Sequence, residues 1–336
     1  MSKIIVTGGT GLVGAHLLYF LTKSGKSPIA IRRNNSNILN VRNIFSYYDT
    51  EYESLFSQIT WKKCDILDII KLEHIIQDVE YIYHCAALIS FNNKDKDRMI
   101  EVNATGTANI IDLSLKYNIK KLCYVSSIAT LGSNNNLPVN ENCFWNWENQ
   151  SGYSVSKYLA EMEVWRGFAE GLSGIIVNPS LIIGPGSWDS GIGTIIRKGQ
   201  WGIPFYPEGS CGLIDVNDLV KTMIELMDSS ITNERFIINA EHMSYKQIMS
   251  IVAKSFNKKS PYIKLNSTWM KVFIWIDIMI NKIRRTKIEL STDAINYTNS
   301  KTILSNEKIN KTISLNYKKI TESIEQCIQI FKNKKS

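Results

Sequence analysis

A tyrosine and a lysine four residues apart form the pair in this sequence best suited to proton transfer. Tyr153 and Lys157 have the spacing that places two side chains on one face of a helix. A free tyrosine has a pKa of about 10, and a nearby ammonium favours the phenolate and lowers that pKa. We therefore predict that Tyr153 exchanges a proton with a substrate. Lys157 would stabilise the Tyr153 phenolate and hold the ribose of a bound cofactor.

Glycines near the start of the chain predict where such a cofactor binds. Gly8, Gly11 and Gly14 form a G-x-x-G-x-x-G pattern within Thr7–Gly14, between a predicted strand and a predicted helix. Gly8 permits a tight turn, Gly11 lets backbone amides approach a pyrophosphate, and Gly14 lets the helix pack close to the sheet. Because a helix N-terminus favours an anion, we predict dinucleotide binding here.

The end of the second predicted strand bears on which dinucleotide is bound. An acidic residue there would hydrogen-bond the ribose hydroxyls of NAD(H), but the strand ends in Arg32 and Arg33. Guanidinium groups suit a 2′-phosphate, so we predict NADP(H) in preference to NAD(H); the alternative is two solvated surface arginines. Asp65 ends the third strand and can accept from the adenine amino group, or it is a turn or helix-cap aspartate.

The Tyr–Lys spacing occurs four times, so its position in the chain must decide which pair is catalytic. The other pairs lie within the first helix, at the opposite end of the sheet and beyond the nucleotide-binding part: Tyr19/Lys23, Tyr117/Lys121 and Tyr297/Lys301. Tyr153 begins a helix shortly after the strand that leads into Ser127. Ser127 can hydrogen-bond and orient a reacting carbonyl or alcohol oxygen; its alternative role is to cap the next turn.

Alternating strands and helices position these groups. The predicted strands cover 3–7, 28–32, 61–65, 79–85, 121–126 and 174–178, and the predicted helices cover 15–23, 67–77, 103–116 and 153–166. The alternation predicts an α/β fold with a Rossmann-type, doubly wound parallel sheet. Ligands bind such sheets at the carboxyl ends of the strands.

The pattern becomes irregular after Pro179, which indicates a second part of the chain. We predict a helix over 220–227 and a strand over 234–239, with the rest mainly helical. Residues 1–180 are predicted as an NAD(P)-binding domain, to which 205–240 partly returns. Residues 181–336 would form mainly a smaller, mainly helical substrate domain.

Composition excludes several classes of protein. With 336 residues, 44% of them hydrophobic, the chain can bury a core, which excludes wholesale disorder. The sequence shows neither a signal peptide nor an apolar run of the ~18–20 residues that span a bilayer. The six cysteines form no C-x-x-C pair, so we expect free thiols in a reducing cytoplasm and no metal site.

The chain has a net charge of +8, and its excess of basic residues lies in 251–336. These residues are scattered and show no nucleic-acid-binding spacing, so we predict a solvated basic surface and no nucleic-acid partner. The most apolar stretch, 269–280, is followed by basic residues up to Lys287. We interpret it as a core or dimer-interface helix in preference to a segment that contacts a membrane at 269–287.

Taken together, the motifs resemble the extended short-chain dehydrogenase/reductase superfamily, also called the NAD-dependent epimerase/dehydratase family, over nearly the whole chain. The resemblance rests on Thr7–Gly14, Asp65, His84–Ala87, Val102-Asn103 with Gly106-Thr107, Ser126-Ser127, Tyr153/Lys157, Asn178-Pro179 with Gly184-Pro185, and Ile214–Asp218. It implies a catalytic triad of Ser127, Tyr153 and Lys157, an active site between the two domains, and a homodimer.

The resemblance also implies which residues contact the cofactor. Ala86 and Ala87 would line its crevice, Asn103 would support the site, and the segment after Pro179 would flank the nicotinamide. The full predicted cofactor set is Gly8, Thr10, Gly11, Leu12, Val13, Gly14, Arg32, Arg33, Asp65, Ile66, Ala86, Ala87, Asn103, Lys157, Pro179 and Ile182.

Departures from the family's patterns narrow the reaction. Ile128-Ala129 stands where sugar dehydratases carry Asp-Glu, and Thr130–Gly132 where sugar epimerases usually show Val-Tyr-Gly. No arginine lies in Ser210–Ile214, where many nucleotide-sugar enzymes place one. Asn178–Gly186 and the two arginines are more similar to the dihydroflavonol reductase, cinnamoyl-CoA reductase and 3β-hydroxysteroid dehydrogenase branch.

We therefore expect an NADPH-dependent carbonyl reductase or alcohol dehydrogenase that acts on a small-molecule carbonyl or alcohol. Its pocket would draw on residues 187–212 and the C-terminal helices, with the aromatic residues Trp188, Trp201 and Tyr206 either facing substrate or forming core. The alternative is a nucleotide-sugar epimerase, in which Arg98 or Arg197 would meet the substrate diphosphate. A cofactor-binding regulator that has lost its chemistry is a third hypothesis, which the intact triad disfavours.

Overall fold

The computed structural model describes residues 3–90, 92–132, 138–189, 191–265 and 301–333. Within these ranges no helix combines the length and apolar character needed to cross a membrane. Two parts of the sequence discussed above, Tyr297 and the apolar and basic segment 269–287, lie outside the described residues.

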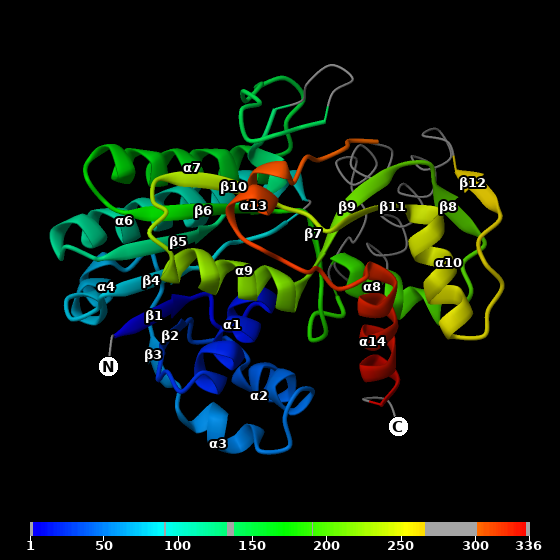
Figure 1. Ribbon diagram of the computed structural model, residues 1–336, viewed down its shortest axis with the longest axis horizontal. Helices are drawn as coiled ribbons and strands as arrows, with labels where there is room; N and C mark the ends of the chain where they lie inside the picture. The colour runs from blue at the N-terminus through cyan, green and yellow to red at the C-terminus, as the bar shows by residue number, and fades with distance from the viewer. Residues whose placement is uncertain (1–2, 91, 133–137, 190, 266–300, 334–336) are drawn as a thin grey trace.

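A parallel sheet of seven strands forms the larger part of the molecule, on the left in Figure 1, in the order β10-β6-β5-β4-β1-β2-β3. The strands are β1 (Ile4–Thr7), β2 (Ile29–Arg32), β3 (Thr60–Lys63), β4 (Tyr81–His84), β5 (Lys121–Val125), β6 (Gly174–Pro179) and β10 (Glu234–Ile238). Every neighbouring pair is parallel. β1 and β6 are buried along their whole length, as their unbroken apolar runs indicate. The predicted Rossmann-type α/β fold is confirmed.

Helices cover both faces of this sheet and enclose two apolar cores. One core contains residues of α1 (Leu12–Lys23), α2 (Ile38–Ser46) and α9 (Val216–Asp228), with the short α3 (Tyr52–Ser57) beside them. The other contains residues of α4 (Ile69–Ile76), α6 (Gly106–Lys116) and α7 (Gly152–Ala169). The short η1 (Asn93–Asp95), α5 (Lys96–Ile100) and a π turn, η2 (Glu101–Thr105), precede α6.

The C-terminal part has its own core and two small sheets. β7 (Leu181–Ile183), β9 (Ser210–Asp215) and β11 (Glu241–Ser244) form one sheet; β8 (Phe205–Pro207) and β12 (Ile263–Leu265) form the other. α8 (Gly191–Gly199), α10 (Tyr245–Ser255) and α14 (Ile320–Asn333) pack beside them, and α13 (Glu307–Thr312) contacts β10 (Figure 1). These strands are short, which is why the sequence pattern suggested a mainly helical region.

The chain leaves the large sheet after β6 and later returns to it. β7, β8 and β9 belong to the small sheets, whereas α9 packs against α1 and β10 pairs with β6 at the sheet edge. The segment that rejoins the nucleotide-binding fold is therefore α9 and β10, which lies inside the predicted 205–240. Part of the framework of the large sheet consequently comes from residues far beyond Pro179.

Candidate active site

The glycine turn between β1 and α1 has the shape of a phosphate cradle. Gly8 has a φ of +66°, which favours glycine, and its carbonyl accepts from the Gly11 amide at 2.9 Å. A Cβ at Gly14 would lie 2.3 Å from the Gly8 oxygen, so only glycine lets the helix start this close to the turn. Gly11 caps α1 without a side-chain hydrogen bond, which leaves the first amides for an anion. These residues fit the pyrophosphate of a dinucleotide.

A buried histidine fixes the strand that runs beside this cradle. His84 contacts Thr7 Oγ1 through Nδ1 at 2.6 Å and Thr107 Oγ1 through Nε2 at 3.0 Å. Burial lowers the pKa of His84 to about 3, so the ring is neutral. Thr7 Oγ1 also accepts from the Ala86 amide at 3.2 Å, and a Cβ at Gly8 would lie 2.7 Å from the Ala86 backbone. The segment that begins at Ala86 therefore adjoins the glycine turn; its contact with the cofactor stays a prediction.

The two arginines at the end of β2 form no ion pair with an acidic residue that the structure describes. Arg32 Nε is buried and lacks a hydrogen-bond partner, and the Arg32 Nη1 donates to the Arg33 carbonyl at 3.5 Å. Arg33 is exposed. Within the part of the chain that the structure describes, no carboxylate forms an ion pair with either residue. Because a buried donor normally has an acceptor, Arg32 fits a site completed by an anionic ligand such as a 2′-phosphate.

Asp65 and Ile66 lie at the turn between β3 and α4. Asp65 Oδ1 accepts from the Leu67 amide at 3.1 Å, so this carboxylate does act as a turn residue; its contact with adenine stays a prediction. Ile66 is buried, and a Cβ at Gly106 would lie 2.5 Å from its side chain. Helix α6 consequently begins close against this turn.

Asn103, in the π turn before α6, supports the site from behind. Its Oδ1 accepts from the Leu88 amide at 2.7 Å, and its Nδ2 donates to the Leu88 carbonyl and to Ser156 Oγ, each at 2.9 Å. The side chain is buried and ties the segment after Ala87 to helix α7. A direct contact between Asn103 and the cofactor stays a prediction.

The segment after β6 presents an unpaired hydroxyl. Pro179 is buried at the strand end, and Ile182 is half-buried in β7. Between them, the Ser180 amide donates to the Ile238 carbonyl at 3.0 Å, while Ser180 Oγ is buried without a partner. This hydroxyl is a polar group that the sequence analysis did not single out, and it lies where the nicotinamide is predicted.

Helix α7 supplies the tyrosine and the lysine. Ser151 Oγ accepts from the Ser154 amide at 3.0 Å and starts the helix, so Tyr153 lies in the first turn and Lys157 one turn later. Lys157 is 2% exposed, and its Nζ donates to Tyr124 Oη at 2.7 Å and to the Val125 carbonyl at 2.8 Å. Burial lowers the pKa of Lys157, and the charge of nearby Glu161 partly opposes this shift. The net result is a pKa of about 7.

Ser127 follows β5 and fulfils the alternative role given to it above. Its Oγ accepts from the Ala129 amide at 3.1 Å and caps the short helix η3 (Ile128–Thr130). Its carbonyl accepts from Asn178 Nδ2 at 3.1 Å. Because this Oγ is an acceptor in the cap, its proton can be donated to a substrate oxygen, so the two roles are compatible.

The aromatic residues proposed for the substrate pocket separate in the structure. Trp188 is core: it is 9% exposed, and its ring centroid lies 5.0 Å from that of Phe331. Trp201 is exposed at the surface. Tyr206 is half-buried, with Lys246 Nζ 4.9 Å from its ring centroid. Of the three, Trp188 therefore has a structural role.

The two arginines proposed for a diphosphate are both paired with carboxylates. Arg98 Nη1 lies 2.6 Å from Glu101 Oε2. Arg197 Nε lies 3.4 Å from Asp189 Oδ1 and donates to the Trp188 carbonyl at 3.3 Å. Neither geometry favours the epimerase alternative.

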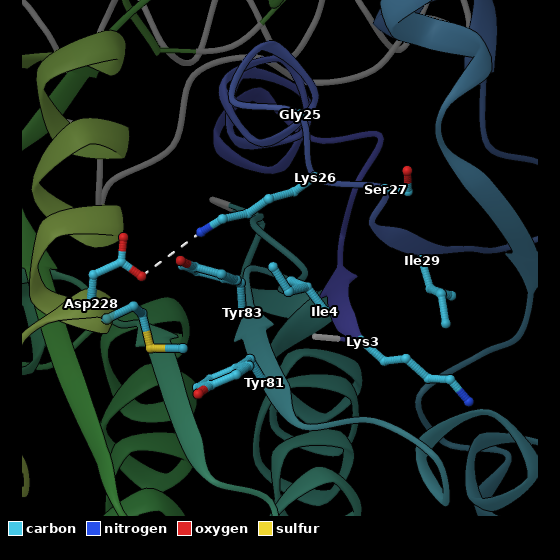
Figure 2. A pocket seen from close by; sticks show the side chains of 10 residues that line it. Lys3, Ile4, Gly25, Lys26, Ser27, Ile29, Tyr81, Tyr83 and Asp228 are labelled. Carbon is cyan, nitrogen blue, oxygen red and sulfur yellow. Dashed lines mark ion pairs between the residues drawn. The ribbon is translucent and has the colours of Figure 1, made fainter. Parts of the chain in front are cut away.

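A pocket at the other end of the sheet does not belong to this site. Figure 2 shows that it is lined by residues at the amino ends of β1 and β4, such as Ile4 and Tyr81, with Lys26 and Asp228 facing each other across it at 3.8 Å. The glycine turn and Ser127 follow the carboxyl ends of their strands, whereas the pocket lies at the amino ends. The two are therefore at opposite ends of the parallel strands.

A family model and solved structures match most of this chain. The family model for the NAD dependent epimerase/dehydratase family matches residues 4–239. The chain belongs to this family. As a member of the NAD-dependent epimerase/dehydratase family it is an enzyme, an NAD(P)-dependent oxidoreductase, and the family binds a nicotinamide cofactor. The resemblance stated from the motifs is confirmed.

Relatives of this family member include reductases and epimerases. It is 29% identical to a putative dihydroflavonol 4-reductase of Synechocystis over 81% of this chain and 78% of that protein. It is 27% identical to the sterol demethylase protein B of Methylococcus capsulatus, over 73% and 72% of the two chains. The solved UDP-glucose 4-epimerase of Thermotoga maritima superposes with a TM-score of 0.79 at 19% identity, over 99% of this chain and 100% of that chain, which shows the shared fold.

Proposed function

We propose that the protein is an NADPH-dependent carbonyl reductase or alcohol dehydrogenase that uses Ser127, Tyr153 and Lys157. One observation carries the proposal. The carboxyl end of β5 and the first turns of α7 lie at the same end of the sheet as the glycine turn. Lys157 Nζ donates to the Val125 carbonyl there at 2.8 Å. The pairing of Arg98 and Arg197 with carboxylates supports a reductase over a nucleotide-sugar enzyme.

The mechanism follows from what each side chain can do. The bound nicotinamide supplies or accepts the hydride. Ser127 Oγ donates a hydrogen bond to the substrate carbonyl oxygen and orients it. Tyr153 gives its proton to that oxygen, and the positive charge of Lys157 stabilises the phenolate left behind. In the oxidative direction Tyr153 takes the proton back.

The preference for NADP(H) is proposed from Arg32 and Arg33, and it predicts a specific loss of affinity. One charged hydrogen bond contributes roughly 1.5–3 kcal/mol, and the two arginines are expected to make at least one to the 2′-phosphate. The Arg32→Ala/Arg33→Ala double variant is therefore expected to bind NADPH at least about tenfold more weakly. NADH affinity should stay within about twofold. Fluorescence titration of the purified protein with NADPH and NADH side by side measures both.

Arg42→Ala is the matched control, since Arg42 is an arginine of the nearby α2 that already pairs with Glu53. This variant should bind both cofactors like the wild type. Tight NAD(H) binding by the wild type, above all as cofactor retained through purification, would contradict the arginine argument. An epimerase would keep its cofactor and show no net NADPH consumption with aldehydes and ketones, whereas the proposed reductase consumes NADPH.

Three further features belong to the proposal. We infer that the substrate binds between the nucleotide-binding fold and the C-terminal part, that the chain forms a homodimer as the family resemblance implies, and that it works in the cytoplasm. All six cysteines are free thiols, as expected for a reducing compartment. Light scattering on the purified protein tests the dimer.

A further inference from the structure

A fully buried carboxylate lies one helical turn beyond Lys157. The Glu161 side chain is 0% exposed, and its Oε2 accepts from Ser126 Oγ at 2.5 Å, Thr130 Oγ1 at 2.7 Å and Asn178 Nδ2 at 2.9 Å. Its Oε1 accepts from Trp165 Nε1 at 3.4 Å and forms an ion pair with Arg235 Nη1 at 3.0 Å. The proposed proton transfer uses none of these atoms.

The arginine partner brings in a further strand and a loop. Arg235 belongs to β10 and also donates from Nε to the Glu141 carbonyl at 2.9 Å. Glu141 Oε1 in turn accepts from the Ile237 amide at 2.9 Å. Arg235 thus fastens the loop before α7, through Glu141, to the edge strand and to Glu161.

The donors around Glu161 come from the segments that hold the proposed catalytic serine. Ser126 precedes Ser127, and Thr130 ends the short helix that Ser127 caps. Asn178 Nδ2 lies 3.1 Å from the Ser127 carbonyl oxygen as well as 2.9 Å from Glu161. Glu161 itself lies on the same helix as Tyr153 and Lys157. The carboxylate is therefore the point at which the serine segment meets the helix of the tyrosine and lysine.

We propose that Glu161, neutralised by Arg235, is a positioning residue that sets Ser127 against Tyr153 and Lys157. The inference rests on the proposed function of these three residues. A buried charge is tolerated only when it is paired and hydrogen-bonded, and here the groups that satisfy it are those whose relative placement the reaction needs. The network consequently holds the site in its working geometry.

Glu161→Gln is the substitution that separates charge from shape. A glutamine has the same size, but its Nε2 is a donor. In one orientation of the glutamine amide, Nε2 faces the donors of Arg235 and Trp165. In the other orientation it faces Asn178 Nδ2, which is also a donor. In both cases two donors meet, so the hydrogen bonds of the network cannot all form. The serine segment should shift relative to α7, whereas the glycine turn, on other elements, stays in place.

The expected result is a split between kcat and KM. With NADPH and an aldehyde or ketone that the wild type reduces, Glu161→Gln should lower kcat by about tenfold or more and change KM for NADPH by less than about twofold. Ser126→Ala, which removes one donor to the carboxylate and leaves its charge, should lower kcat by about threefold to tenfold. Glu163→Gln is the matched control, because Glu163 lies on the same helix but pairs with Arg166 at the surface; its kinetics should equal those of the wild type.

A pH profile provides a readout that a purely structural loss would not move. Burial lowers the pKa of Lys157 to about 7, and the Glu161 charge opposes this shift. The ammonium is lost as pH rises, so kcat should fall on the alkaline side, and in Glu161→Gln the fall should begin at lower pH. The other titratable groups around Lys157, namely Cys85, His84 and Tyr124, are unchanged in this variant.

The outcomes distinguish the two proposals. A wild type that reduces no carbonyl compound would overturn the proposed function itself. A wild type that does reduce a carbonyl compound, together with Glu161→Gln and Ser126→Ala kinetics equal to those of Glu163→Gln, would overturn the positioning role alone. If Glu161→Gln does not fold, as thermal unfolding would show, the folded Ser126→Ala variant decides: unchanged kcat overturns the proposal, and reduced kcat with unchanged KM for NADPH supports it.

Discussion

Tyr153→Phe is expected to lower kcat by about a hundredfold to ten-thousandfold, which is the contribution that a positioned proton donor makes to a rate. The variant loses only a hydroxyl, from the first turn of α7, while Lys157 keeps its hydrogen bonds to Tyr124 and Val125. NADPH affinity should therefore stay within about twofold of the wild type. Steady-state consumption of NADPH with the best substrate, together with a fluorescence titration of cofactor, measures both quantities.

Tyr117→Phe is the matched control for this experiment. Tyr117 begins another Tyr–Lys pair of the same spacing, but its hydroxyl donates to Glu73 Oε1 at 2.7 Å, at the C-terminal end of α6. Loss of that hydroxyl should leave turnover unchanged. Full activity in Tyr153→Phe would refute the assignment of Tyr153 as proton donor, and weakened NADPH binding without loss of kcat would reassign it to cofactor binding.

Gly14→Ala has the second large expected effect, a loss of NADPH affinity of about a hundredfold or more. Its Cβ would lie 2.3 Å from the Gly8 oxygen and 2.9 Å from the Gly8 carbonyl carbon, so the backbone of the turn must move away from the helix. That movement separates the turn from the helix N-terminus whose amides would meet the pyrophosphate. Fluorescence titration with NADPH measures the effect, and thermal unfolding shows whether the variant is folded.

Gly25→Ala, at the other end of α1, controls for the cost of a methyl group at a special backbone position. Gly25 has a φ of +77°, and an added Cβ there would meet nothing within 4 Å. Its variant should lose about 1 kcal/mol of stability from the strained backbone and bind NADPH normally. NADPH binding by folded Gly14→Ala within threefold of the wild type would count against the glycine turn as the cofactor cradle.

The regular part of the fold was predictable because its signals are local. The start of α4 shows this: a helix was predicted over 67–77, and Asp68 caps the observed helix by accepting from the Lys71 amide. Helices α2 and α3 were not predicted. The apolar residues Val41, Ile44 and Phe45 of α2 do have helical spacing, so this spacing was a signal that the sequence analysis missed. The short strands of the C-terminal part carry too few residues for an alternating pattern.

The candidate site likewise contains residues with local sequence signals and residues whose role depends on distant contacts. The glycine turn, Ser127, Tyr153 and Lys157 stand in short motifs, so each could be located from its neighbours. Glu161 is four residues after Lys157, and this spacing indicates that the two residues share one face of α7. The role of Glu161, however, depends on Arg235 from a distant strand. The burial of Ser180 Oγ is equally invisible without the structure.

The position of β10 has a consequence for how such a protein can be divided. The edge strand that pairs with β6 and carries Arg235 follows the first strands of the C-terminal part in the chain. A polypeptide cut after Pro179 would expose the edge of β6 and leave Glu161 buried without its counter-ion, so we expect it to misfold. Exchange of the C-terminal part between homologues would require three junctions: one before β7, one after β9 and one after β10. The C-terminal part is therefore not encoded by one continuous segment, because α9 and β10 of the large sheet are inserted in it.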